Sequence, residues 1–250
     1  MRAQFAFCTA VVTTVFFSNV ALAEGDARSN YNEPTRGFFI EHGTVAKNRD
    51  ASIELHSGSD IEAGGGVRLG LDGSELIINS GLDGYDENQL LIKYGLSDLH
   101  LGGEGGSPIH WTFTGAYSRT ELEDDNGNDI IDQINLKLGA AFTVNADAAT
   151  FTLAPRFVYA DGSAPRGIAR DDTFLELDLG AYVGIIDTKS GLFSAGVEAL
   201  FTTADKVDNT YAAGVRWAYD SKLNLDFVPL VFSDRDLVGV PGLVRVNYNF

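Results

Sequence analysis

The chain ends in the stretch Pro241-Gly-Leu-Val-Arg-Val-Asn-Tyr-Asn-Phe250, whose alternation points to one class of fold. Alternate side chains of an extended strand point to opposite faces. One face of this stretch carries the apolar and aromatic residues Val244, Val246, Tyr248 and Phe250. The other face is mostly polar and carries Leu243, Arg245, Asn247 and Asn249. The stretch therefore predicts a strand whose apolar face extends to the last residue.

A terminal strand of this kind resembles the closing strand of Gram-negative outer-membrane β-barrels, with a final Phe250 and aromatic residues at alternate positions before it. The resemblance implies a barrel in the cell outer membrane, surrounded by lipid and lipopolysaccharide. It also implies that the barrel assembly machinery reads the strand ending at Phe250. On this stretch alone, the alternative is a terminal strand in a soluble β-sandwich.

The N-terminal residues have the composition of a secretory signal peptide. Met1 and Arg2 give a basic start, a nearly uncharged stretch follows, and Ala21-Leu-Ala23 places small residues at a cleavage site. We predict a signal peptide over residues 1–23, with an uncleaved anchor as the alternative, and an N-terminal periplasmic segment over residues 24–50. Cys8 lies in the signal peptide, so disulfides, thiol nucleophiles and cysteine metal sites are excluded from the mature chain.

Residues 51–250 consist of alternating segments separated by Gly, Asp and Asn clusters, which is typical of a many-stranded antiparallel protein. We predict an all-β fold, a transmembrane antiparallel β-barrel of about twelve strands, with ten or fourteen as alternatives. The predicted strands cover residues 51–58, 63–71, 74–82, 89–104, 108–119, 130–142, 149–160, 173–186, 192–203, 209–219, 222–232 and 241–250.

Three positions should interrupt this regularity. The phase of the fourth strand shifts near Ser97-Asp98, which indicates either a bulge or two short strands. Pro155 and Pro229 lie inside predicted strands, where each removes a ladder donor, and should mark bulges or breaks.

The connections alternate in length. Asp72-Gly73 and Asp220-Ser221 are brief, whereas residues 120–129 and 161–172 are long and charged. Short turns on one rim and long loops on the other are typical of outer-membrane barrels. A periplasmic C-terminus places the long loops outside the cell. The acidic stretch 120–132 is interpreted as a solvated loop tip, with weak divalent binding as the alternative, because Asp129 stands where an EF-hand requires glycine.

Most predicted strands have one apolar face with aromatic residues near its ends, as in Ile109, Trp111, Phe113, Gly115 and Tyr117. That pattern indicates two aromatic girdles around a hydrocarbon band. The opposite faces are rich in Thr, Gly, Asn and Ala, which suits the interior of a closed barrel. The charged residues expected on the inner face are Glu54, Arg68, Lys93, Lys137, Arg156, Glu176, Asp178, Glu198, Arg216, Asp226 and Arg245.

These inner charges allow two interpretations. Opposed acidic and basic side chains could line an aqueous pore that orients polar solutes. They could instead fill the interior with their own salt bridges and leave nothing to conduct. Eight strands give a filled barrel and sixteen an open channel, so about twelve strands lie between these cases.

The sequence predicts no catalytic, cofactor-binding or metal site. His42, His56, His100 and His110 are scattered, without a serine and an acid at a spacing typical of outer-membrane hydrolases. With 35 acidic and 18 basic residues, the chain has a net charge of −17, which speaks against nucleic acid as a partner. The leading hypothesis is a narrow porin-like channel for small polar solutes. A non-conducting structural or surface-interaction barrel comes second, and an outer-membrane hydrolase comes third.

Overall fold

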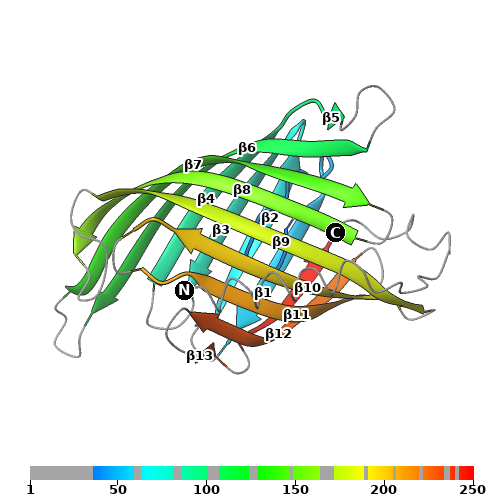
Figure 1. Cartoon of the computed structure of the whole chain (residues 1–250). Coiled ribbons are helices and arrows are strands. Elements are labelled where there is room, and N and C mark those ends of the chain that lie inside the picture. The colour runs from blue at the N-terminus through cyan, green and yellow to red at the C-terminus, as the bar shows by residue number, and fades with distance from the viewer. Residues whose placement is uncertain are drawn as a thin grey trace, which may run out of the picture.

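The computed structural model describes residues 36–58, 63–81, 86–100, 107–123, 129–146, 149–163, 172–188, 191–204, 207–219, 222–233, 237–239 and 242–250. Their strands form one closed antiparallel barrel (Figure 1), in which the first strand pairs with the last. Twelve strands make the wall, as predicted, and the alternatives of ten and fourteen are wrong. The described residues include no helix that is long and apolar enough to cross a membrane.

Each wall strand corresponds to one predicted segment. The wall strands are β1 (Ala51–Ser57), β2 (Gly64–Leu71), β3 (Ser74–Gly81), β4 (Asp86–Gly95), β6 (Pro108–Glu123), β7 (Asp129–Ala146), β8 (Ala149–Ser163), β9 (Asp172–Thr188), β10 (Gly191–Thr202), β11 (Thr210–Ala218), β12 (Leu223–Ser233) and β14 (Leu243–Asn249). Two short strands, β5 (Leu99–His100) and β13 (Leu237–Gly239), extend the edges of β6 and β12.

The predicted fourth strand ends earlier than expected. Strand β4 stops at Gly95, which pairs with Thr112, and β5 resumes the pairing where Leu99 faces Ile109. Leu99 is four residues after Gly95, but their partners Ile109 and Thr112 on β6 are only three residues apart. One extra residue therefore lies between Gly95 and Leu99. This agrees with the predicted bulge near Ser97-Asp98, which divides the predicted strand into β4 and β5.

The two prolines behave differently. At Pro229 the pairing of β11 with β12 shifts register between Ala213 and Val215, as expected where proline removes a ladder donor. At Pro155 the pairing of β7 with β8 is interrupted, but its register is the same on both sides. The bulge prediction is confirmed at Pro229, and only a local gap is found at Pro155.

The outer surface of the barrel is apolar. Every wall strand exposes a large apolar side chain: Ile53, Val67, Ile78, Ile92, Phe113, Leu138, Phe157, Leu175, Phe193, Val215, Phe227 and Val246. Leu138 is 67% exposed. A soluble monomer seldom carries so continuous an apolar surface, and a closed barrel leaves no unpaired strand edge in lipid. The predicted outward faces are therefore confirmed, and the wall is that of a transmembrane barrel.

Aromatic rings gather near both ends of this surface. Trp111 stacks on Phe142, and Phe193 stacks on Trp217, with ring centroids 5.7 and 5.6 Å apart, at the end with the short β7–β8 and β9–β10 turns. At the opposite end, the Tyr211 ring contacts the rings of both Phe201 and Phe232. These groups lie where the sequence predicted two aromatic girdles.

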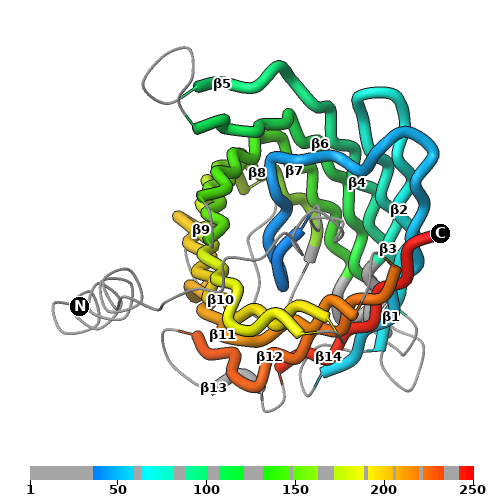
Figure 2. Tube along the Cα trace, turned by 90° about the vertical axis from the view of Figure 1, so that its right-hand side faces the viewer, coloured from blue at the N-terminus to red at the C-terminus, as the bar shows by residue number. Residues whose placement is uncertain are grey.

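Residues 36–50 are called the internal segment below. Their first part lies inside the ring of strands, as the blue trace in Figure 2 shows, and the exposed residues 47–49 lead back to the wall. The assignment of residues 24–50 to the periplasmic side stays a prediction. The segment first folds back on itself, with a bridge between Arg36 and Glu41 and a hydrogen bond from the Gly37 N–H to the Ile40 carbonyl at 2.7 Å. Residues 1–35, including the predicted signal peptide, and the acidic tip at 124–128 lie outside the described residues.

Candidate functional site

The interior of the barrel holds the charged residues singled out from the sequence. Those buried most deeply are Glu54, Arg68, Lys93, Asp178, Glu198, Arg216, Asp226 and Arg245. Lys137, Arg156 and Glu176 also project inward but keep part of their side chains exposed. The structure separates the set into residues that hold the internal segment and residues that pair only along the wall.

Two arginines bind the backbone of the internal segment. Arg216 of β11 donates to the carbonyl oxygens of Arg36 and Gly37, both at 3.1 Å. Arg245 of β14 donates to the carbonyl of Gly37 at 2.6 Å and to the next carbonyl along the chain at 2.7 Å. Asp226, on the strand between them, pairs with both guanidinium groups. The two arginines, held by Asp226, thus donate hydrogen bonds to three consecutive carbonyl groups, those of residues 36–38.

Glu198 binds the same part of the segment by accepting hydrogen bonds from the segment's backbone N–H groups. Its carboxylate accepts the backbone N–H groups of Phe38 and Phe39 at 2.5 and 2.8 Å. The hydroxyl of Tyr182, on the neighbouring strand β9, also donates to Glu198. Because charge-assisted hydrogen bonds are stronger than neutral ones, this carboxylate is a major anchor of the segment.

A second anchor surrounds Glu41. Its carboxylate lies 2.5 Å from Arg68 and 3.3 Å from Lys93, and both cations also pair with Glu75 of β3. Burial by itself would raise the pKa of Glu41, but the charges of Arg68 and Lys93 outweigh that effect and hold the pKa well below its usual range. The segment therefore contributes a permanent negative charge to a buried cluster of both signs.

Close backbone contacts complete the attachment. The Gly43 N–H donates to the Thr143 hydroxyl at 2.8 Å, and the Ala46 N–H donates to Glu75 at 3.3 Å. A Cβ atom at Gly43 would overlap the backbone of β6 and β7, and one at Gly37 would overlap the side chains of Tyr182 and Glu198. Glycine is needed at both positions because the segment passes so near the wall.

A separate group of charges lies on β7, β8 and β9, and we call it the lumen network. Glu176 accepts hydrogen bonds from Lys137 at 3.1 Å and lies 3.3 Å from Arg156, which also pairs with Asp178. The side chains of Lys137, Glu176 and Arg156 remain 24%, 18% and 16% exposed. These are inward-facing charges with surface that solvent can still reach.

A cavity of about 330 Å³ lies between the second half of the internal segment and strands β1, β12 and β14. Most of the residues that line it are polar or charged, and they include Asn224, Asn247 and Asn249 on the wall and Lys47 on the segment. The lining offers donors and acceptors of neutral and charged kinds, which suits water or a small polar solute.

Several residues of this interior were not identified from the sequence. Arg36, Glu41 and Gly37 belong to the internal segment, and Glu75 and Tyr182 belong to the wall. Glu75 could have been found by strict alternation along residues 74–81, because it shares a face with Ile77, which is fully buried. The residues of the segment follow no strand periodicity, so only their composition, with Gly37 beside an apolar group, was a signal.

The histidines remain apart from one another. His42 lies against the Tyr182 ring, His56 is 3.4 Å from Glu54, and His110 is 2.9 Å from Asp98. Across the part of the chain that the structure describes, no group of three or more His, Cys, Asp or Glu side chains could hold a metal ion.

No family model and no curated protein matches the chain. Among solved structures, it is similar to the KdgM porin in complex with disordered oligogalacturonate, at 8% identity and a TM-score of 0.47, over 80% of this chain and 96% of the porin. It is also similar to a loop-deletion mutant of the outer-membrane protein OmpT of Vibrio cholerae, at 13% identity and a TM-score of 0.43, over 78% of this chain and 65% of OmpT. The similarity to OccAB3 of Acinetobacter baumannii has 10% identity and a TM-score of 0.37, over 75% of this chain and 55% of OccAB3. Likenesses this distant carry no information about a solute or an activity.

Proposed function

We propose that the protein is a narrow outer-membrane channel for small polar solutes, constricted by the internal segment. The observation that carries this proposal is the exposed surface of the lumen network. Lys137, Glu176 and Arg156 project inward from the wall, yet each keeps 16 to 24% of its side chain accessible. Charges on an inner wall that remain accessible to solvent are the residues past which a hydrated solute would move.

The arrangement of these charges favours a class of solute. Glu176 lies between two cations, so both signs are within a few ångströms of each other along the wall. Such a lining orients dipolar or zwitterionic molecules and gives little net preference for simple anions or cations. The proposed solutes are therefore small, polar and of low net charge.

The second candidate is a non-conducting structural barrel. It is favoured by the internal segment, whose ion pairs and hydrogen bonds join it to the wall at Glu198, Arg216 and Glu75. If the segment closes the lumen, the inner charges stabilise the barrel and no solute passes.

Conductance separates the two candidates. Protein refolded in detergent and inserted into a planar bilayer is expected to give discrete, small conductance steps with weak ion selectivity. The absence of such steps over a wide voltage range, for protein that shows the heat-dependent gel mobility of a folded barrel, would favour the structural role.

We further propose that export and assembly follow the signals at the two ends of the chain. Residues 1–23 are removed after export, and the barrel assembly machinery recognises β14. Support for the second step comes from Phe250, which is 66% exposed and whose N–H donates to the Ala51 carbonyl at 2.8 Å, where β14 meets the first strand. An aromatic side chain presented outward at the closing seam is available to an assembly factor.

A further inference from the structure

The first half of the internal segment is held as a bound peptide would be. Arg216 and Arg245 donate to successive carbonyl groups of residues 36–38, and Glu198 accepts the N–H groups of Phe38 and Phe39. All three wall residues act on backbone atoms, which every peptide possesses. Asp226 fixes the arginines from the wall, so the arrangement does not depend on the side chains of the segment.

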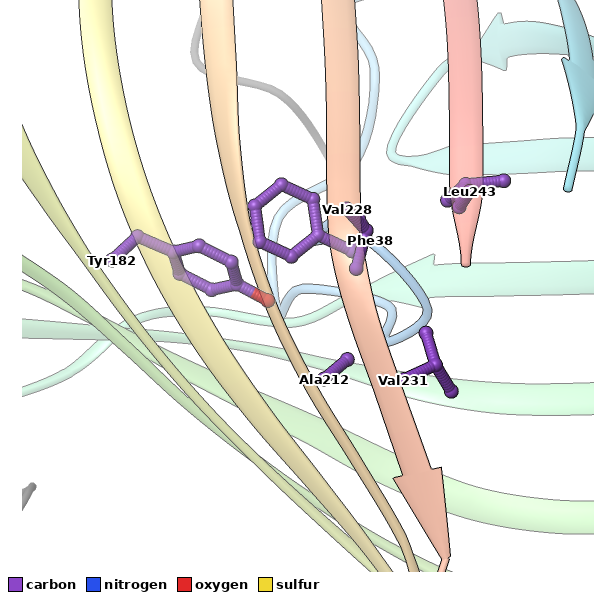
Figure 3. Packing of buried hydrophobic residues seen from close by; sticks show 6 residues of the cluster. All are labelled: Phe38, Tyr182, Ala212, Val228, Val231 and Leu243. Atoms are coloured by element: carbon purple, nitrogen blue, oxygen red, sulfur yellow. The ribbon is translucent and has the colours of Figure 1, made fainter. Parts of the chain in front are cut away.

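An apolar pocket accompanies these polar groups. The Phe38 ring is 1% exposed and packs among side chains of four wall strands (Figure 3): Tyr182, Ala212, Val228, Val231 and Leu243. Its centroid is 5.7 Å from that of Tyr182 in an edge-on arrangement, and the Arg216 guanidinium lies 5.8 Å from it. The pocket thus combines aliphatic walls, an aromatic edge and a cation, which together suit an aromatic ring.

We infer that this place on the inner wall, the Phe38 site, is a binding site for short peptides that carry an aromatic residue, and that the internal segment is its built-in occupant. The inference deepens the proposed function, on which it rests for the class of solute, and assigns that class a binding site on the inner wall. Among small polar solutes it selects those with consecutive carbonyl and N–H groups beside an aromatic side chain. A saccharide offers hydroxyl groups but neither the amide pattern nor the ring that the pocket encloses.

The measured affinity of a free peptide for the Phe38 site depends on competition with the internal segment, which occupies the same site. A segment joined to the wall through β1 presents its residues at an effective concentration of roughly millimolar or higher. A free peptide must therefore displace a strong internal competitor in the unmodified protein. Weakening that competitor without altering the wall should reveal the site.

The test uses the full-length mature chain in detergent and the peptide acetyl-Arg-Gly-Phe-Phe-amide, which repeats residues 36–39. The variant Phe38→Ala leaves every wall residue intact but empties the aromatic pocket. Isothermal titration calorimetry is expected to give saturable binding to this variant, at least about tenfold tighter than to the unmodified chain. Gly37→Ala, whose added methyl group overlaps Tyr182 and Glu198, should unmask the site by a different route.

Matched controls locate the binding. Adding Glu198→Ala to Phe38→Ala is expected to abolish it, whereas adding Asp132→Ala, which removes an exposed carboxylate that pairs with Arg119, should leave it unchanged. The peptide acetyl-Arg-Gly-Ala-Ala-amide should bind at least about tenfold more weakly, because it lacks the ring. Heat-dependent gel mobility confirms that each variant is a folded barrel.

Three results would overturn the inference. The first is that neither unmasked variant binds the peptide more tightly than the unmodified chain does. The second is that the alanine peptide binds equally well. The third is that free phenylalanine binds as tightly as the peptide. The last result would show that the arginines read a carboxylate and not a peptide backbone. Binding is measured without a membrane, so it is separate from conductance: binding without conductance contradicts the channel alone, and conductance without binding contradicts the Phe38 site alone.

Discussion

Glu198 accepts the backbone N–H of Phe38 at 2.5 Å, although 160 residues separate the two along the chain. The contact joins strand β10 to a segment that precedes the first strand of the barrel. Its strength comes from a carboxylate that meets two adjacent amide groups in an interior largely shielded from water. The barrel wall and the internal segment are therefore one structure.

Replacing Glu198 should release the segment. With Glu198→Ala, two backbone N–H groups lose their acceptor, at a cost of about 1–3 kcal/mol for each group that stays buried. Ile40, which is fully buried, provides the reporter: as Ile40→Cys it would be the single thiol of the mature chain. We expect its labelling by a maleimide to accelerate at least about tenfold. Equal rates with Glu198→Ala and with the control Glu176→Ala would contradict the anchoring role.

The contribution of Glu41 to holding the segment should persist through mild acid. The pKa of Glu41 is lowered in the folded protein from its ordinary value of 4.5, so its stabilising effect is complete above that value and is lost only as pH falls through the lowered one. At each pH, Ile40→Cys should be labelled more slowly in the chain with Glu41 than in the chain that also carries Glu41→Gln. The ratio of the two rates should be constant from pH 8 to about 5 and fall only in stronger acid. A ratio that falls with a midpoint near pH 6 would contradict this role of Glu41.

Removing a cation from the lumen network should change ion selectivity. Arg156→Ala leaves Glu176 and Asp178 facing the lumen with less positive charge beside them. In a salt gradient, the reversal potential is expected to move toward the value for cations. Arg119→Ala is the matched control, because Arg119 is exposed and pairs with Asp132 away from this network. Identical reversal potentials for both variants would place the conducting path elsewhere.

The apolar wall offers a test of membrane insertion. Leu138 is 67% exposed near the middle of β7, and an arginine there should destabilise a barrel in a bilayer by about 2–4 kcal/mol. Leu71, at the end of β2, is also exposed, but arginine at an interface should cost only about 0–1 kcal/mol. Urea unfolding from lipid vesicles measures both values. Similar small effects at the two positions would indicate that the wall faces water.

Alternation along the chain was enough to predict the wall. Arg216 and Arg245 were placed on the inner face because their neighbours Val215 and Val244 follow a period of two, and all four lie on the expected sides. Residues paired across neighbouring strands lie on the same face, so the same alternation holds along every wall strand. Where it failed, between Gly95 and Leu99, one inserted residue shifted the phase.

The position of the internal segment could not be predicted in the same way. Its bonds to Glu198, Arg216 and Arg245 use backbone atoms, so they leave no pattern in the side chains of residues 36–39. Besides the composition of the segment, one indirect signal was present: inner charges of both signs need partners when they are buried. The sequence offered pore and salt-bridged interior as alternatives, and neither included a segment from outside the strands.

The most direct test compares the single-channel conductance of the mature chain with that of a chain lacking residues 24–49, which retains every wall strand. We expect discrete steps from both proteins and larger steps from the shortened one, because the internal segment occupies part of the lumen. Steps of equal size would contradict the claim that the segment constricts a channel, and the absence of steps from both folded proteins would contradict the channel itself.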